Sequence, residues 1–141
     1  GVNGNMGYKR LQALNLIYDK DYCEKNIMLC DLGDEFLFKD FGKMDYTNDY
    51  KEIIKNDNIE KVVLSVPNSK ERDKIIMKLL ESRKHILVEK PLAFDREVIS
   101  NFFNIAAKNK VFLKVAYNLD YFPLQVFRSI SNRLLEFYTF N

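Results

Sequence analysis

The chain has 141 residues, of which 47% are hydrophobic and 30% are charged, so it can enclose one hydrophobic core of ordinary globular composition. The 22 basic residues are interspersed with 20 acidic ones, which predicts no binding surface for nucleic acid or anionic membranes. No apolar run reaches the roughly 20 residues that span a bilayer, and we expect a cytoplasmic protein. The spacing of Cys23 and Cys30 predicts neither a disulfide framework nor a metal site.

The first half of the chain begins with a glycine-rich loop over residues 1–7. Apolar residues at helical spacing then predict a helix from about Asn5 to Lys20. The short apolar run Ile27–Cys30 is typical of a buried strand and ends at Asp31. We expect a short helix over Tyr50–Lys55, and Phe36–Phe38 could form a short strand before it.

In the second half, strands alternate with helices. The predicted strands are Lys61–Val66, His85–Lys90, Val111–Ala116 and Leu135–Phe140, and the helices begin at Ser69, Asp95 and Pro123. Pro67 and Pro91 stop the first two strands because proline cannot donate a backbone hydrogen bond. The alternation predicts right-handed βαβ units and a doubly wound α/β domain with a parallel sheet covered on both faces.

The opening loop, Gly1-Val2-Asn3-Gly4-Asn5-Met6-Gly7, has the composition of a dinucleotide-binding turn. Such glycines let the backbone approach a pyrophosphate, which then faces the free N–H groups of the following helix. On the usual G-x-G-x-x-G pattern, Gly4 and Gly7 match and Val2 takes the first glycine's place. The loop taken alone is also compatible with a glycine-rich turn that binds nothing.

Asp31 follows the next predicted strand. A carboxylate at that position can accept hydrogen bonds from the adenosine ribose and repel a 2′-phosphate, which favours NAD over NADP. The alternative is that Asp31 only begins a solvated turn.

Two later motifs carry a family resemblance. Val62–Asn68, then a helix, then Lys84–Ala93 resemble the signature of the glucose–fructose oxidoreductase, inositol dehydrogenase and rhizopine-catabolism family (Gfo/Idh/MocA). In that family, a strand ending in T-P-N and a strand ending in E-K-P-L-A flank the nicotinamide, and Ala116-Tyr117-Asn118 resembles its G-Y-N segment. The resemblance implies a Rossmann-type NAD(P)-binding domain. The implied cofactor-binding residues are Gly4, Asn5, Met6, Gly7, Asp31, Val66, Pro67, Asn68, Glu89, Lys90 and Asn118.

The resemblance also implies that Lys90 is the catalytic or substrate-orienting residue. A cationic Lys90 could polarise a carbonyl or bind the hydroxyl that is oxidised. The alternative is a charged strand end paired with Glu89 or solvent. Asn68 could contact the cofactor or could cap the following helix. His85 matches the family's G-K-H segment and is expected to be structural.

Some features differ from the family pattern. Val66 stands where members have threonine, and Glu71 where many have histidine. The glycine loop begins at residue 1, so we expect the first Rossmann strand to lie outside this sequence. Family members also continue into a second α/β domain, which we likewise expect to lie outside it. We assign residues 1–120 to the NAD(P)-binding domain and 121–141 to the truncated start of a substrate and oligomerisation domain.

Together with the glycine loop and Asp31, the resemblance implies an oxidoreductase that transfers a hydride between NAD, with NADP possible, and a hydroxyl-bearing carbon of a sugar, sugar nucleotide or cyclitol. The expected partners are that small-molecule substrate and, at full length, further copies of the chain. A non-catalytic nucleotide-binding module and an inactive truncated fragment are the alternatives. A dihydrodipicolinate-reductase-like protein shares the G-x-x-G-x-M-G opening, but the E-K-P motif argues against it.

Overall fold

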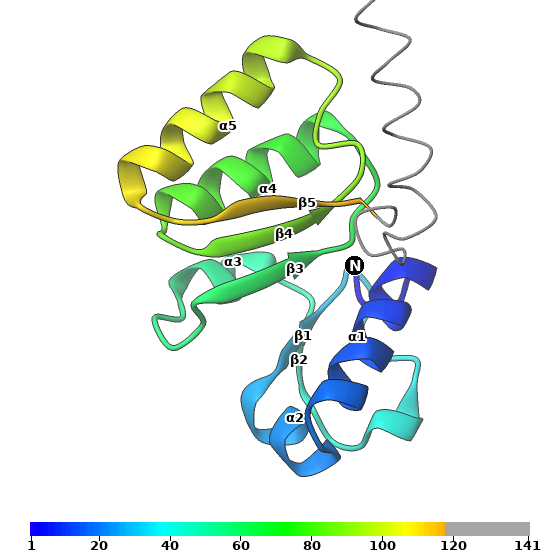
Figure 1. Ribbon diagram of the computed structural model, residues 1–141. Coiled ribbons are helices and arrows are strands. Elements are labelled where there is room, and N and C mark those ends of the chain that lie inside the picture. The colour runs from blue at the N-terminus through cyan, green and yellow to red at the C-terminus, as the bar shows by residue number, and fades with distance from the viewer. Residues whose placement is uncertain (118–141) are drawn as a thin grey trace, which may run out of the picture.

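The computed structural model describes residues 1–117 (Figure 1). Helices and parallel strands alternate along this part of the chain, as the sequence predicts. The elements are α1 (Asn5–Ile17), α2 (Lys20–Asn26), β1 (Met28–Cys30), the 3₁₀ turn η1 (Lys39–Phe41), β2 (Asp45–Thr47), α3 (Tyr50–Lys55), β3 (Lys61–Leu64), α4 (Lys70–Glu81), β4 (His85–Glu89), α5 (Arg96–Asn109) and β5 (Leu113–Ala116).

Every strand pair in the described residues is parallel. β1 pairs with β2, and β3, β4 and β5 form a second sheet in that order. α4 and α5 lie side by side over β4 and β5 (Figure 1). Parallel strands joined by helices place all their carboxyl ends at one edge, so the expected α/β class is confirmed.

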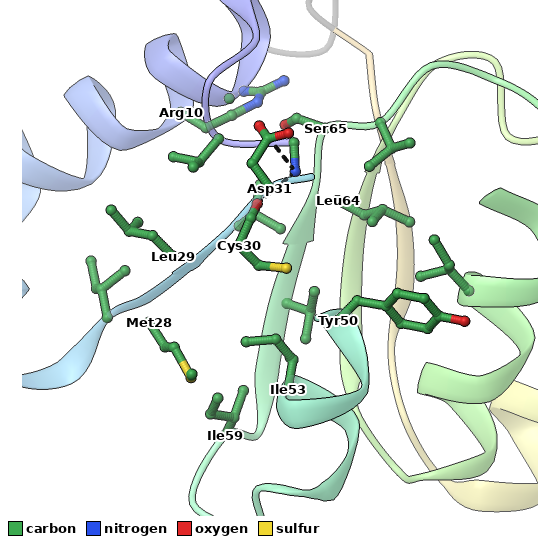
Figure 2. A pocket seen from close by; sticks show the side chains of 18 of the residues that line it. Arg10, Met28, Leu29, Cys30, Asp31, Tyr50, Ile53, Ile59, Leu64 and Ser65 are labelled. Atoms are coloured by element: carbon green, nitrogen blue, oxygen red, sulfur yellow. Dashed lines mark hydrogen bonds and ion pairs between the residues drawn. The ribbon is translucent and has the colours of Figure 1, made fainter. Parts of the chain in front are cut away.

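A slot separates the two sheets. β1 and β3 do not pair with each other in the described range, and a cavity of about 800 Å³ lies between them, lined mainly by apolar side chains from both strands, the neighbouring helices and the loops. Figure 2 shows Met28, Ile53 and Ile59 along this slot, with Asp31 and Ser65 at its other end.

Gly1 lies at the polar end of the slot. Its amino group donates to the carbonyl oxygen of Cys30 at 2.8 Å, and a Cβ on Gly1 would be 2.2 Å from the carbonyl oxygen of Ser65. The glycine loop is therefore held tightly between the ends of β1 and β3.

Two hydrophobic clusters stabilise the fold. The larger one joins α4 and α5 to the β3–β5 sheet and contains Ile76, Leu80, Val88 and Phe102, each less than 2% exposed. The smaller cluster is centred on Leu11, Leu29 and Phe41, and Val2 packs against it.

Several predicted boundaries are wrong. The helix predicted to run to Lys20 ends at Ile17, because Asp19 accepts a hydrogen bond from the Tyr22 N–H and begins α2 instead. Phe36–Phe38 is not a strand. The ring of Phe38 packs on that of Tyr8, with 4.3 Å between the centroids, and the strand lies later, at β2.

The remaining strand limits shift by one or two residues. β3 ends at Leu64, β4 at Glu89, and β5 begins at Leu113. Asn118, the predicted helix from Pro123, the predicted strand Leu135–Phe140 and the boundary at residue 120 lie outside the described residues. Within residues 1–117, no helix has the length and apolar character to cross a membrane.

Candidate functional site

The glycine loop leads into the N-terminus of α1. Gly4 is the N-cap residue and offers no side-chain cap, and the first turn carries no acidic residue. The first helical bond runs from the Tyr8 N–H to the Gly4 carbonyl at 2.9 Å. The amides of Asn5, Met6 and Gly7 therefore have no acceptor within the helix, and an anion placed there would be favoured.

The two matching glycines have different surroundings. A Cβ on Gly7 would be 2.1 Å from the Gly1 carbonyl oxygen and 2.7 Å from the Val2 Cα, so only glycine fits. Gly4 is exposed, and a Cβ there would meet only the Gly1 carbonyl oxygen at 3.6 Å. Gly7 thus allows the loop to close on the helix, whereas Gly4 leaves its outer face open.

Asp31 is joined to this loop. One carboxylate oxygen accepts from the Asn3 N–H at 2.7 Å and the other from the Leu32 N–H at 2.7 Å. The side chain is 20% exposed, and a carboxylate oxygen can accept more than one hydrogen bond. Asp31 is therefore more than the start of a solvated turn, although its contact with a ribose stays a prediction.

The two proline-stopped strand ends lie next to each other. One guanidinium nitrogen of Arg72, Nη1, donates to the carbonyl oxygens of both Val66 and Glu89, each at 3.3 Å. The β3–β4 register, with Leu64 opposite Val88, brings the ends to the same edge. The proposed nicotinamide-flanking motifs are thus adjacent in space.

Asn68 is not the helix cap. Ser69 has that role, because its hydroxyl accepts from the Arg72 N–H at 3.1 Å, so the capping alternative for Asn68 is wrong. Within residues 1–117, the Asn68 amide nitrogen and the Ser65 hydroxyl are both buried and have no protein partner. Buried polar groups without partners are costly, which is compatible with a polar ligand at this edge.

Glu89 connects this edge to the glycine-loop helix. Its Oε1 accepts from Arg10 of α1, at 2.7 Å from Nη2 and 2.8 Å from Nε. Figure 2 shows Arg10 beside Asp31 and Ser65 at the polar end of the slot. The glycine loop, Asp31 and the end of β4 therefore share one side of the molecule.

Lys90 is exposed and, within residues 1–117, makes no hydrogen bond or ion pair. No ion pair joins Lys90 to Glu89 in this range, and Glu89 binds Arg10 instead; the alternative of a solvated strand end agrees with the exposed side chain, so the catalytic role stays a prediction. The Lys90–Pro91 peptide bond is cis. The ammonium group is available to a ligand at the carboxyl edge of the sheet.

Comparison with known proteins agrees with this arrangement. The family model described as "Oxidoreductase family, NAD-binding Rossmann fold" (GFO_IDH_MocA) matches residues 1–117. The chain belongs to this oxidoreductase family. No curated protein matches the sequence.

Solved structures of this class share the fold. Levoglucosan dehydrogenase in complex with NADH and levoglucosan is 23% identical over 82% of this chain and 33% of its own, with a TM-score of 0.65. An NAD-binding oxidoreductase from Klebsiella pneumoniae is 21% identical over 82% of this chain and 32% of its own, with a TM-score of 0.69. A 3-ketoreductase from Actinomadura kijaniata with NADP is 25% identical over 68% of this chain and 29% of its own, with a TM-score of 0.58. The chain spans about a third of the length of these proteins.

The residues present fit the dinucleotide that the family name implies. The N-terminus of α1 has no side-chain cap, the outer face of Gly4 is open, and the buried Asn68 amide nitrogen has no partner among the described residues. The residues described contain no cluster of His, Cys, Asp and Glu side chains that could hold a metal ion.

Sequence reasoning missed two arginines at this site. The sequence does indicate that Arg72 is unusual. It lies on the same face of α4 as the buried Ile76, Leu79 and Leu80, where an apolar residue is expected. No local pattern indicates the role of Arg10, because its partner Glu89 is 79 residues away in the sequence. The expected structural role of His85 agrees with its contacts, since its Nδ1 accepts from the Phe112 N–H at 3.0 Å.

Proposed function

We propose that this chain is the dinucleotide-binding part of a dehydrogenase acting on a hydroxyl-bearing carbon of a sugar, sugar nucleotide or cyclitol. Bound NAD would supply the hydride acceptor. Gly4, Asn5, Met6 and Gly7 would hold the pyrophosphate, and Asp31 the adenosine ribose. Among the neighbours, one is named a levoglucosan dehydrogenase and another a 3-ketoreductase, which supports the choice of substrate class.

Lys90 would orient the substrate oxygen. Its exposed ammonium is at the carboxyl edge of the sheet, where open α/β folds bind their ligands, and it has no competing partner in the described residues. A cation there would stabilise negative charge that develops on the oxygen as its proton leaves. Val66, Pro67, Asn68 and Glu89 would form the wall beside it, and the Asn68 amide, which has no partner in the part of the chain that the structure describes, would donate to the ligand.

One observation carries this proposal. The ion pair between Arg10 and Glu89 joins the helix that follows the glycine loop to the strand that ends immediately before Lys90. Because these two motifs are far apart in sequence, their meeting at one edge is what a dinucleotide-spanning site needs.

The test uses the full-length protein, because the substrate domain is expected to lie outside this sequence. NADH fluorescence measures cofactor binding, and turnover is followed at 340 nm with NAD and a panel of glucose, myo-inositol, levoglucosan and a nucleoside-diphosphate sugar. Lys90→Ala should lower turnover by about 10²–10⁴-fold while NADH binding is retained. Lys108→Ala, an exposed lysine in the last turn of α5, is the matched control. Turnover unchanged in Lys90→Ala would exclude the proposed role.

The competing proposal is a nucleotide-binding module without catalysis. It shares the glycine loop and Asp31 but assigns no chemistry to Lys90. Tight NADH binding with no turnover across the panel, and no effect of Lys90→Ala on any reaction, would favour it.

A further inference from the structure

The buried arginine of α4 carries an inference that rests on the proposed function and deepens it. Arg72 is 1% exposed, and no acidic side chain in the described residues forms an ion pair with it. A buried cation needs compensation for the water it loses. Here the compensation comes from main-chain carbonyl groups.

Four carbonyl oxygens surround the Arg72 guanidinium. Nη1 binds those of Val66 and Glu89, and Nη2 binds those of Pro91 and Leu92, the latter at 2.7 Å. The first acceptor belongs to the segment after β3 and the other three to the end of β4 and the segment that follows it. One side chain therefore links two separate stretches of backbone.

These stretches lie where the sheet no longer supports them. The β3–β4 ladder ends at Leu64 and Val88, and the β4–β5 ladder ends at Glu89 and Ala116. Lys90 is the first residue beyond both. The carbonyl groups on either side of it, those of Glu89 and Pro91, are both bound by Arg72, so its backbone is fixed while its side chain stays exposed.

We infer that Arg72 is a positioning residue that holds Lys90 at a fixed place relative to the Val66–Asn68 segment. The planar guanidinium suits this role because its N–H groups point in fixed directions and can donate to several carbonyl oxygens at once. A lysine ammonium keeps the charge but not this geometry. Arg72 touches neither substrate nor cofactor in this assignment and acts only through the backbone of Lys90.

Two variants and a control test this role. Arg72→Lys keeps the charge, Arg72→Met keeps the approximate shape, and Arg96→Lys changes an exposed arginine at the start of α5. Amide hydrogen exchange of the full chain is measured at a temperature at which circular dichroism shows each variant folded. We expect exchange to rise by at least about tenfold, equivalent to about 1.4 kcal/mol, at residues 65–69 and 89–94 only. Exchange in the interior of α5 and in β5 should stay as in wild type.

A second readout reports the position of Lys90. Trace acetylation by acetic anhydride is compared at Lys90 and Lys108 with and without saturating NAD⁺. NAD⁺ should protect Lys90 in wild type and in Arg96→Lys, and protection should fall in both Arg72 variants. Unchanged protection, unchanged exchange in the two segments, or exchange raised uniformly over the chain would each overturn the positioning role.

A measurement on the wild type alone covers the case in which the variants do not fold. The backbone order parameter of Lys90 from ¹⁵N relaxation should be near 0.85, as in rigid elements, and a value below about 0.6 would overturn the inference. If NAD⁺ fails to protect Lys90 in wild type, the proposed function fails. The exchange and relaxation data then decide the role of Arg72 by themselves.

Discussion

Replacing Gly7 by alanine should damage both the stability and the cofactor binding of this domain. The added methyl group would lie 2.1 Å from the Gly1 carbonyl oxygen, 2.7 Å from the Val2 Cα and 2.9 Å from the Gly1 carbonyl carbon. All three are backbone atoms, so no flexible side chain can move aside. The start of the glycine loop must shift away from α1.

The size of the effect follows from two opposing terms. Alanine is a better helix former than glycine by about 0.5–1 kcal/mol, whereas forcing a group into a packed site costs about 1–3 kcal/mol and sometimes more. Because the overlaps here all involve the backbone of the Gly1–Val2 peptide and the shortest is 2.1 Å, the steric term should dominate. We expect a net loss of about 1–2 kcal/mol, or about 4–8 °C in Tm for a domain of this size.

The assay pairs Gly7→Ala with Gly4→Ala as a matched control. A methyl group on Gly4 meets only the Gly1 carbonyl oxygen at 3.6 Å, an ordinary contact, so Gly4→Ala should lose only the preference of the N-cap position for glycine over alanine, about 0.5 kcal/mol, and should melt above Gly7→Ala. NADH titration should show weaker binding in both variants, in Gly4→Ala because the methyl group stands where the pyrophosphate would approach. A Gly7→Ala protein with wild-type Tm, or a Gly4→Ala protein with wild-type NADH affinity, would refute the respective half of this reasoning.

Two further variants test the polar contacts of the site. Asp31→Ser removes a carboxylate bound to the glycine loop, so NADH affinity should fall by about tenfold or more. The affinity for NADPH should fall less, because the carboxylate that repels the 2′-phosphate is gone. If fluorescence titrations show an unchanged ratio of NADH to NADPH affinity, Asp31 does not contact the ribose. Glu89→Gln breaks a pair whose side chains are 26% and 13% exposed, and urea denaturation should show a loss of about 1.5–3 kcal/mol. Lys25→Gln breaks the exposed pair with Asp21 and should lower the free energy of unfolding by at most about 0.5 kcal/mol. Equal losses in Glu89→Gln and Lys25→Gln would show that the Arg10–Glu89 pair stabilises the fold no more than an exposed pair does.

The sequence predicts the second half of the fold better than the first. β3 and β4 are runs of apolar residues that end near prolines, and α4 and α5 begin at Ser69 and Asp95, whose side chains cap them as expected. Apolar runs, prolines and helix-capping residues are local features of the sequence, so they can be recognised without knowledge of the tertiary structure.

The first half lacks such signals. β2 has three residues, of which Thr47 alone is buried, and three residues are too few to show an alternating pattern. α2 is a polar helix with Cys23 as its one buried residue, so it has no apolar stripe that could be distinguished from the end of α1.

The candidate site shows the same division. The glycine loop, Asp31 and the two proline-stopped strands could be named from spacing and resemblance. The hydrogen bonds from Arg72 to four carbonyl groups could not, because carbonyl acceptors belong to every residue and leave no trace in the sequence. The ion pair of Arg10 with Glu89 depends on tertiary packing that a local pattern does not contain.

The slot between β1 and β3 determines what kind of segment it could accept. In the described part of the chain, the edges of both strands that face the slot pair with no other strand, and the slot is lined largely by Ile, Val and Leu side chains. Edges of this kind accept extended segments by main-chain pairing. An extended apolar segment seated there would therefore pair with both sheets at once and cover the apolar lining.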